Sequence, residues 1–296
     1  MDKNGVINIG VIGLGVMGKN HVRTCSELPN FNVLGVADIR KEAIDEIRSQ
    51  YDVKAFLDYR EVLDIPNLDA VVIATSDQFH REPCEIAARK GLSIFLEKPI
   101  ATSVEDGEAI IQVTKQNDVK LMVGHTLRFD PRYVAVKQAA DGGKFGEFVH
   151  FYARRNATTW SGKRVQGRAE VVVFQGVHDI DFLQWVTGEK VVRVSAEAVS
   201  RNLTELGVAD TIMATLRFSN GAIGLLEQSW GLPYGLPWML DAQLEIVGTQ
   251  GAMYIDTKAP AVSTFFNDRY VQPEVILGLP GSHCLKDEYL WFSEFL

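Results

Sequence analysis

The sequence predicts a doubly wound α/β domain over residues 1–124, followed by an α+β domain with a large, open-faced, mainly antiparallel sheet over residues 125–296. Three observations predict this division. In the first half, short apolar segments rich in β-branched residues alternate with helical segments. A glycine-rich turn follows the first apolar segment. Beyond about residue 125, strand-like segments follow one another with turn residues between them.

The apolar runs of the first half are too short for helices of ordinary length and are typical of buried strands. The expected strands are residues 6–12, 32–37, 70–74, 93–96 and 121–124. The expected helices between them are residues 17–27, 41–50, 83–90 and 105–116. Parallel strands joined by right-handed crossovers place such helices on both faces of one sheet.

In the second half the expected strands are residues 148–152, 191–198, 211–217, 222–227, 243–247 and 252–255. One long helix, residues 177–186, interrupts this series. Near the end, apolar residues recur at helical spacing, at Leu285, Tyr289, Phe292 and Leu296. This amphipathic helix stops without a cap or polar tail, so we expect a C-terminal truncation, with natural shortening as the alternative.

Composition excludes several classes of protein. Among 296 residues, 38 are acidic and 30 basic, which gives a net charge of −8 and disfavours a nucleic-acid binder. Three scattered cysteines do not make a disulfide framework or a thiolate metal cage. No apolar run approaches the roughly 18 residues of a membrane span, and no signal-peptide cleavage pattern is present. We therefore expect a cytoplasmic protein without membrane or nucleic-acid partners.

The sharpest motif is the turn Gly13-Leu14-Gly15-Val16-Met17-Gly18, which follows a strand and opens a helix. Such glycines let a pyrophosphate approach the backbone at a helix N-terminus, as in Rossmann domains. Asp38 ends the second strand, where a carboxylate binds the ribose 2′-hydroxyl. NAD is therefore favoured, and NADP remains the alternative because Arg40 and Lys41 follow. The expected cofactor-binding residues are Gly13, Gly15, Val16, Met17, Gly18, Asp38, Ile39 and Arg40.

Three further motifs follow in order: Glu97-Lys98-Pro99, Gly124-His125 with Arg128-Phe129-Asp130-Pro131, and Gly176-Val177-His178-Asp179-Ile180-Asp181. Together with the glycine turn they resemble the Gfo/Idh/MocA oxidoreductases, named for glucose–fructose oxidoreductase, inositol dehydrogenase and a rhizopine-catabolism protein. The resemblance runs from about Ile7 to Ile255. It implies NAD(P)-dependent transfer of a hydride between nicotinamide and a secondary hydroxyl or ketone of a sugar, cyclitol or nucleotide sugar. It also implies a homodimer or homotetramer that pairs through the C-terminal sheet.

The resemblance implies Lys98 and His178 as catalytic residues. A neutral histidine suits removal of a hydroxyl proton, and a lysine ammonium stabilises a developing alkoxide. The resemblance also places Thr75, His80, Glu97 and Lys98 at the cofactor. Asp181 lies three residues after His178 on the same helical face and is expected to orient the imidazole. His80 and Cys84 are four residues apart, but Pro83 lies between them and no second ligand pair exists, so no metal site is expected.

One position departs from the family pattern. Many family dehydrogenases carry aspartate four residues before the histidine, and here that residue is Phe174. Phenylalanine cannot accept a proton or bind a hydroxyl by hydrogen bonding. Two alternatives therefore stay open: a non-catalytic regulatory protein that binds NAD and a sugar, and a redox-neutral glycosidase or epimerase that retains its NAD.

The segment 151–169 carries five basic residues and no acid inside an acidic protein. A loop of this kind would bind the phosphate of a nucleotide sugar or the carboxylate of a sugar acid, although a solvated surface loop has the same composition. The expected substrate-binding residues are Lys98, Arg154, Trp160, His178 and Asp181.

Overall fold

The computed structural model describes residues 5–234, 240–258, 262–266, 269–271 and 282–296, with no side chains described between 259 and 283. The chain forms two compact units, Met1–Thr126 with Gly281–Leu296, and Leu127–Pro280. The end of the first segment lies close to the predicted boundary at residue 124. The last residues belong to the first unit, which corrects the prediction that the second domain runs to residue 296.

The first unit contains a fully parallel six-stranded sheet with the order β3-β2-β1-β4-β5-β6. Its strands are β1 Ile7–Ile12, β2 Phe31–Ala37, β3 Lys54–Phe56, β4 Ala70–Ile73, β5 Ser93–Glu97 and β6 Leu121–Gly124. The order reverses between β1 and β4, and in such sheets ligands bind beyond the carboxyl ends of the strands at this reversal. The predicted Rossmann architecture is confirmed.

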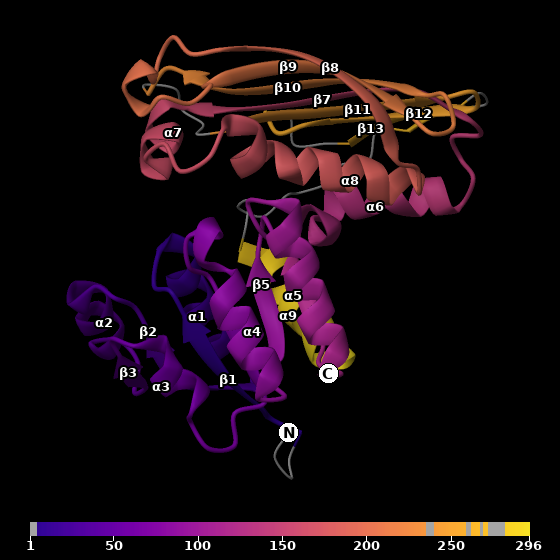
Figure 1. The fold of residues 1–296 in the computed structure, drawn as a ribbon. Coiled ribbons are helices and arrows are strands. Elements are labelled where there is room, and N and C mark those ends of the chain that lie inside the picture. Colours follow the sequence, from indigo (N-terminus) through magenta and orange to yellow (C-terminus); the bar gives the residue numbers. More distant parts are fainter. Residues whose placement is uncertain (1–4, 235–239, 259–261, 267–268, 272–281) are drawn as a thin grey trace. The chain divides into compact units, whose positions relative to one another are not determined.

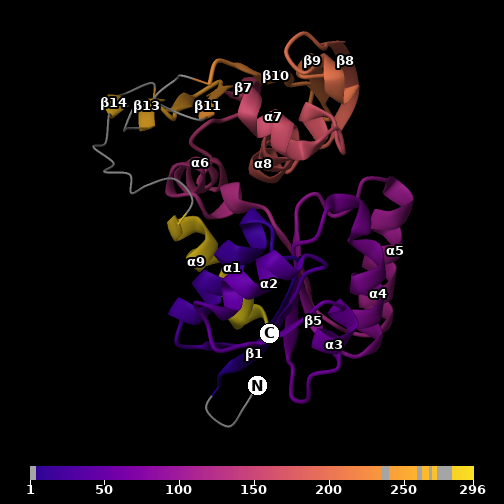
Figure 2. The ribbon, with the colours of Figure 1, turned by 90° about the vertical axis from the view of Figure 1, so that its left-hand side faces the viewer.

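Helices cover both faces of this sheet, as Figure 2 shows with α1, α2 and α9 on one side and α3, α4 and α5 on the other. They are α1 Val16–Glu27, α2 Lys41–Arg48, α3 Tyr59–Leu63, α4 Arg81–Arg89, α5 Val104–Gln116 and α9 Ser282–Phe295. The predicted C-terminal helix is α9. It joins this unit because Tyr289 and Phe292, both fully buried, pack on Phe95 of β5.

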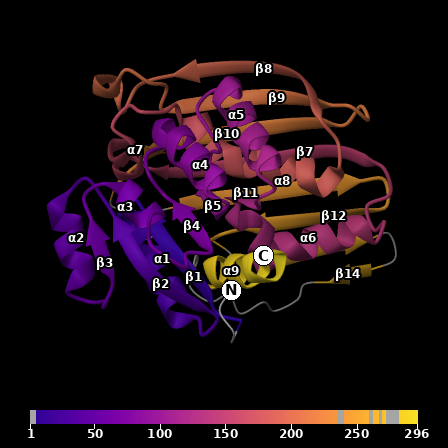
Figure 3. The ribbon, with the colours of Figure 1, turned by 60° about the horizontal axis from the view of Figure 1, so that its bottom comes forward.

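The second unit contains an eight-stranded mixed sheet with the order β14-β13-β12-β11-β7-β10-β9-β8, in which only β7 and β10 pair in parallel among the described strands. Figure 3 shows much of this order. The strands are β7 Phe148–Thr158, β8 Val191–Val199, β9 Thr211–Phe218, β10 Ile223–Leu232, β11 Leu240–Gly248, β12 Gly251–Asp256, β13 Val262–Phe266 and β14 Arg269–Val271. The predicted open-faced, mainly antiparallel sheet is confirmed.

Helices α6 Pro131–Asp141 and α8 Val177–Thr187 lie along one face of this sheet (Figure 1), and α7 Thr159–Val165 follows β7. Alternate residues of each strand face these helices. In β7 these are Phe151, Ala153 and Arg155, of which the first two belong to the apolar core of the unit. The intervening residues Tyr152 and Arg154 therefore lie on the opposite face, which no helix of the described residues covers and which is called the helix-free face.

The sequence did not reveal every element. Helix α6 was missed because its buried residues Arg132, Tyr133 and Val136 do not form a simple apolar stripe. Its start was nevertheless signalled by Asp130, whose side chain accepts a hydrogen bond from the Arg132 N–H, and by Pro131 in the first turn. The short elements β3 and α3 were also missed. Among the described residues, no helix is both long enough and apolar enough to cross a bilayer.

Candidate active site

The glycine turn between β1 and α1 is shaped by backbone contacts that exclude larger residues. Gly13 has φ +90°, and a Cβ atom there would lie 2.6 Å from the carbonyl oxygen of Ala74. A Cβ atom on Gly18 would lie 1.7 Å from the carbonyl oxygen of Gly13. Beside Gly15, by contrast, no described atom lies within 4 Å of the Cβ position. The turn is therefore closed at Gly13 and Gly18 and leaves space at Gly15.

This space lies at the start of α1, which fits the pyrophosphate of a dinucleotide. Gly15 is the N-cap, and as a glycine it has no side chain that could cap the helix. The first turn of α1, which is fully described, holds no acidic residue. The free backbone N–H groups and the positive end of the helix attract phosphate. The predicted residues Val16, Met17 and Gly18 form the first turn of this helix.

Asp38 follows β2 and binds the glycine turn. Its carboxylate accepts a hydrogen bond from the Leu14 N–H at 2.7 Å and others from the Arg40 N–H and Nε at 2.9 and 3.0 Å. Partial burial acts to raise the pKa of Asp38, but the hydrogen bonds from Arg40 and Leu14 outweigh it and lower the pKa. Asp38 is therefore an ionised acceptor, suited to ribose hydroxyls, while the neighbouring Ile39 side chain is 89% exposed.

Replacing Asp38 with serine is expected to lower kcat/KM for NAD by about 10- to 100-fold, because hydrogen bonds to a charged acceptor contribute about 1.5–3 kcal/mol. The same change should raise kcat/KM for NADP, since the charge that repels a 2′-phosphate is gone. The measurement is kcat/KM for both cofactors. Asp45→Ser is the control, because Asp45 lies on the exposed face of α2 and pairs with Lys41. Unchanged cofactor preference in Asp38→Ser would contradict this role.

The loop after β4 contacts the loop after β5 through His80. The buried imidazole contacts the carbonyl oxygen of Pro99 through Nδ1 at 3.0 Å and that of Thr75 through Nε2 at 3.3 Å. Burial lowers the pKa of His80 despite these carbonyl contacts. His80 therefore connects Thr75 with Pro99, the residue after Lys98. In this geometry His80 would act at the cofactor by positioning these loops, and its direct contact with the cofactor stays a prediction.

Glu97 ends β5, and Lys98 follows it at the carboxyl edge of the parallel sheet. The Glu97 carboxylate is buried and accepts a hydrogen bond from the Lys98 backbone N–H at 3.1 Å. Burial acts to raise the pKa of Glu97, but the His21 hydrogen bond and the charges of His21 and Lys98 outweigh it and lower the pKa. The lysine side chain is half-buried beside an ionised carboxylate.

Helix α9 contributes two buried polar residues to this region. The Tyr289 hydroxyl contacts Nδ1 of His21 at 2.8 Å, and Nε2 of His21 contacts Oε1 of Glu97 at 2.9 Å. The preceding Glu288 is fully buried, and neither of its carboxylate oxygens has a hydrogen-bond partner among the described residues. Burial, and secondly the charge of Glu97, raises the pKa of Glu288 well above its ordinary value, so Glu288 is held in its protonated form.

Replacing Glu288 with glutamine is expected to stabilise the protein at neutral pH. The native state keeps the proton on Glu288, whereas the unfolded chain releases it above its ordinary pKa of 4.5. The wild type therefore loses stability as pH rises from that value, and a glutamine does not. We expect Tm to rise by about 3 °C or more at about pH 8 and to change little near about pH 4. Glu294→Gln, on an exposed position of α9, is the control. An equal Tm difference at both pH values would contradict the assignment.

In the second unit, His178 lies in the first turn of α8, directly after the π-helical turn Val172–Gly176. The next residue, Asp179, is buried and fixes this turn to the sheet. Its carboxylate accepts hydrogen bonds from Arg155 of β7 at 2.9 and 2.8 Å and from Gln228 of β10 at 2.8 Å. The pKa of Arg155 stays raised, because the Asp179 charge outweighs the effect of burial. A buried ion pair therefore holds the backbone that carries His178.

Asp181 lies one turn further along α8. Both of its carboxylate oxygens accept hydrogen bonds from the Arg128 guanidinium, at 2.9 and 2.6 Å. The carboxylate is therefore held by Arg128, and the expected orientation of His178 by Asp181 stays a prediction.

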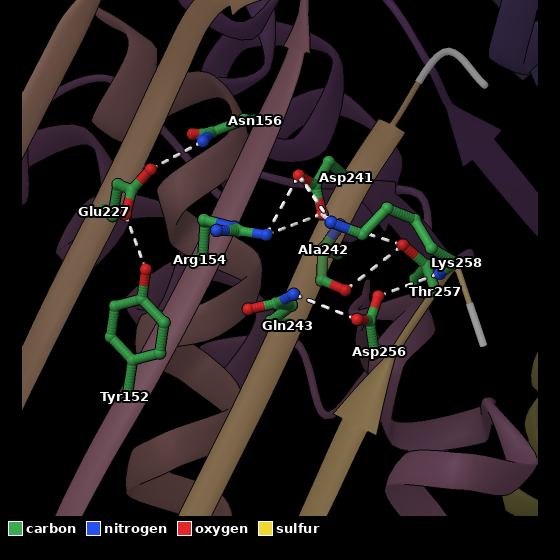
Figure 4. Close-up of polar contacts among 10 residues, drawn as sticks. All are labelled: Tyr152, Arg154, Asn156, Glu227, Asp241, Ala242, Gln243, Asp256, Thr257 and Lys258. Carbon is green, nitrogen blue, oxygen red and sulfur yellow. Dashed lines mark hydrogen bonds and ion pairs between the residues drawn. The ribbon is translucent and has the colours of Figure 1, made fainter. Parts of the chain in front are cut away.

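Arg154 lies on the face of the sheet away from α8, and its expected place in the substrate site stays a prediction. Figure 4 shows Arg154 of β7 pointing toward Asp241 of β11. The Arg154 guanidinium donates to both carboxylate oxygens of Asp241, at 3.0 and 2.9 Å. The adjacent Arg155 pairs instead with Asp179 of α8, on the other face of the sheet. The reason is the two-residue period of a strand, which puts adjacent arginines on opposite faces.

The expected anion-binding loop is in fact the end of β7 and the helix α7. Two of its arginines already pair with carboxylates, Arg154 with Asp241 and Arg155 with Asp179. Trp160 on α7 is 40% exposed, and the Arg164 guanidinium lies 4.7 Å from its ring centroid. Arg154 and Arg155 are therefore neutralised within the protein, which weakens the argument for a phosphate-bearing substrate.

Residues 7–125 match the model for the oxidoreductase family with an NAD-binding Rossmann fold, and residues 133–254 match the GFO/IDH/MocA C-terminal domain. The chain belongs to the Gfo/Idh/MocA oxidoreductase family. Its first unit is the family's NAD-binding domain, so the predicted family and cofactor are confirmed.

Several relatives of this family act on cyclitols. The chain is 29% identical over 255 residues to myo-inositol 2-dehydrogenase of Thermotoga maritima, covering 84% of this chain and 75% of that protein. It is 28% identical to scyllo-inositol 2-dehydrogenase (NAD+) of Bacillus subtilis, covering 85% and 74%. The fold is similar, with a TM-score of 0.83 at 24% identity, to scyllo-inositol dehydrogenase of Lactobacillus casei with bound NAD(H) and scyllo-inositol, covering 98% and 88%.

The family pattern and this chain differ at Phe174, and the structure shows what the phenylalanine does. It lies in the π-helical turn before α8, where it packs against an apolar cluster that includes Val165, Leu203 and Trp230. The rings of Phe174 and Trp230 have centroids 6.1 Å apart. Phe174 therefore acts in packing, and proton transfer must use other residues.

Sequence reasoning missed residues that support both predicted catalytic groups. Arg155 and Gln228 hold Asp179 below His178, and His21 and Tyr289 connect to Glu97 beside Lys98. A signal was present only for Arg155, as one of five basic residues in the segment 151–169, beyond the strand expected at residues 148–152. The others become visible only when distant segments are brought together.

Proposed function

We propose that this Gfo/Idh/MocA protein is an NAD-dependent dehydrogenase that oxidises a secondary hydroxyl of a cyclitol or free sugar to a ketone. The observation that carries the proposal is a lysine at the carboxyl edge of a cofactor-binding sheet, next to the ionised and buried Glu97. Its relatives from Thermotoga maritima and Bacillus subtilis, which carry the names of inositol 2-dehydrogenases, support the substrate class.

The chemistry divides between the cofactor and the chain. The glycine turn and Asp38 would hold NAD, which when bound would supply the hydride acceptor for the carbinol carbon. In the proposal, His178 takes the hydroxyl proton as the C–O bond becomes a carbonyl, and the Lys98 ammonium stabilises the negative charge that develops on that oxygen. The negative charge of Glu97 attracts the Lys98 ammonium, and Asp179 fixes the turn that carries His178.

Cyclitols and free sugars are proposed as substrates in preference to nucleotide sugars. The reason is that Arg154 and Arg155, which could bind a phosphate, are already paired with carboxylates. The test offers the protein NAD with each member of a panel of inositols, aldoses and nucleotide sugars. The absorbance of the reduced cofactor measures turnover. Turnover on an inositol or a free sugar is expected. Turnover on nucleotide sugars alone would contradict the proposed substrate class.

We also propose that the protein assembles as a homodimer or homotetramer through the helix-free face of the second sheet. Exposed apolar side chains lie on this face at Met213, Ile223 and Leu225. Beside them a groove of about 450 Å³ is lined by residues that include Tyr152 and Glu245. Large apolar patches of this kind commonly mark protein interfaces.

Light scattering on the purified protein is expected to give the mass of a dimer or tetramer. Leu225→Glu should lower that mass towards the monomer, because a charge would be buried in the interface. The matched control is Leu57→Glu, at an exposed position of the first unit. A monomeric wild type would contradict the assembly.

A cytoplasmic location is proposed as well. It is supported by Cys25 and Cys84, which are buried and form no disulfide in the described part of the chain. Such cysteine usage is typical of a reducing compartment.

A further inference from the structure

The most unusual buried feature of the first unit is a chain of polar side chains that links α9 to the residue before Lys98. It runs from the Tyr289 hydroxyl to His21 and from His21 to Glu97, over distances of 2.8 and 2.9 Å. All three side chains are buried, His21 and Tyr289 completely. They come from α9, α1 and β5, so three distant segments of the sequence meet here.

The hydrogen between Glu97 and His21 can be assigned from chemistry. The ionised carboxylate of Glu97 can only accept hydrogen bonds, so Nε2 of His21 carries the hydrogen between them. The other ring nitrogen, Nδ1, makes its hydrogen bond with the Tyr289 hydroxyl. The second carboxylate oxygen of Glu97 accepts from the Lys98 N–H at 3.1 Å. Both ends of the Glu97 carboxylate are therefore fixed.

We propose that Tyr289 is a positioning residue for Lys98, which acts by fixing His21 and, through it, the Glu97 carboxylate. The proposal rests on the role of Lys98 given under the proposed function. Without the hydroxyl, Nδ1 of His21 would lose its buried hydrogen-bond partner, and the ring would lose the arrangement that directs Nε2–H at Glu97. The negative charge beside Lys98 would then be less well fixed, and the ammonium form would be less favoured.

The packing of Tyr289 lets the hydroxyl be tested separately from the ring. The ring stacks on Phe95 with centroids 5.0 Å apart and meets Phe31 edge-on at 5.3 Å. A phenylalanine keeps these contacts. The titratable groups that face the chain are Lys98 and Glu288 at the Glu97 end and Cys25 beside Tyr289. Burial raises the pKa of Cys25 to about 12, so this thiol stays neutral.

The test measures the titration of Lys98 directly. Competitive labelling of amines with acetic anhydride over a pH series, read by mass spectrometry, gives the pH midpoint at which Lys98 becomes reactive. In Tyr289→Phe we expect this midpoint to fall by about 0.5–1 pH unit, on the scale of a single lost charge-assisted contact. We also expect kcat to fall about 10-fold with KM for NAD unchanged, because the glycine turn and Asp38 are not part of the chain.

The control is Phe292→Leu, which changes a fully buried residue of α9 that packs on Phe95 at 5.7 Å. It should lower Tm and leave the Lys98 midpoint unchanged. A wild-type midpoint in Tyr289→Phe, or an equal shift in both variants, would overturn the proposal. The labelling experiment does not depend on turnover. A wild type that is inactive on every inositol, aldose and nucleotide sugar would refute the proposed function, whereas the positioning role of Tyr289 is decided by the Lys98 midpoint alone.

Discussion

Replacing Lys98 with alanine is expected to lower kcat by about 1,000-fold, while affinity for NAD stays within a few-fold of the wild type. Lys98 follows β5 at the carboxyl edge of the sheet, beside the ionised Glu97. Its ammonium is assigned to stabilise charge that appears only as the hydroxyl proton leaves, so its loss affects the transition state more than cofactor binding. The measurements are steady-state kinetics and NAD binding by calorimetry.

Two further variants sharpen this test. Lys98→Arg keeps the positive charge but cannot release a proton at accessible pH, so partial activity would assign an electrostatic role. Lys90→Ala is the matched control, because Lys90 is an exposed residue paired with Asp64 after α4. Full activity of Lys98→Ala would contradict the catalytic assignment.

Replacing Arg155 with methionine is expected to destabilise the protein by about 3–5 kcal/mol, the cost of leaving one member of a buried ion pair uncompensated. Asp179 would remain buried without its guanidinium partner, although it would keep the hydrogen bond from Gln228, and the turn that carries His178 would loosen. Urea unfolding measures the free energy, and kcat should fall as well because His178 is displaced.

The neighbouring residue supplies the control for Arg155. Arg154→Met removes a half-buried pair with Asp241 on the other face of the same strand, and should cost about 1 kcal/mol or less. The double change Arg155→Met with Asp179→Leu should recover part of the stability lost in the single variant, since no charge is then left unpaired. Equal stability of Arg155→Met and wild type would contradict this account.

Much of the first unit could be predicted from local patterns. The apolar strands, the turn from Gly13 to Gly18 and the acid at Asp38 are close together in sequence, and each has a direct geometric reason. The predicted strands of the second unit were correct in position but shorter than β7, β10 and β11. Their extensions contain polar residues such as Arg154 and Asn156, which pair across the helix-free face (Figure 4).

What the sequence could not supply are contacts between distant segments. Arg154 and Arg155 look alike as adjacent basic residues, and only the sheet shows that one faces Asp241 and the other Asp179. Helix α9 belongs to the first unit because Tyr289 and Phe292 pack on Phe95. No local sequence pattern indicates this contact. These contacts decide which charges are available to a substrate.

The central claim is that the protein moves a hydride from a carbinol carbon to NAD. The most direct measurement incubates the protein with NAD and inositols deuterated at their carbinol carbons, followed by mass spectrometry of the nicotinamide product. Reduced NAD that carries the deuterium is expected with the wild type, and about 1,000-fold slower formation of it with Lys98→Ala. Binding of NAD and inositol without any reduced NAD would contradict the account, as would turnover of a sugar that leaves the cofactor oxidised.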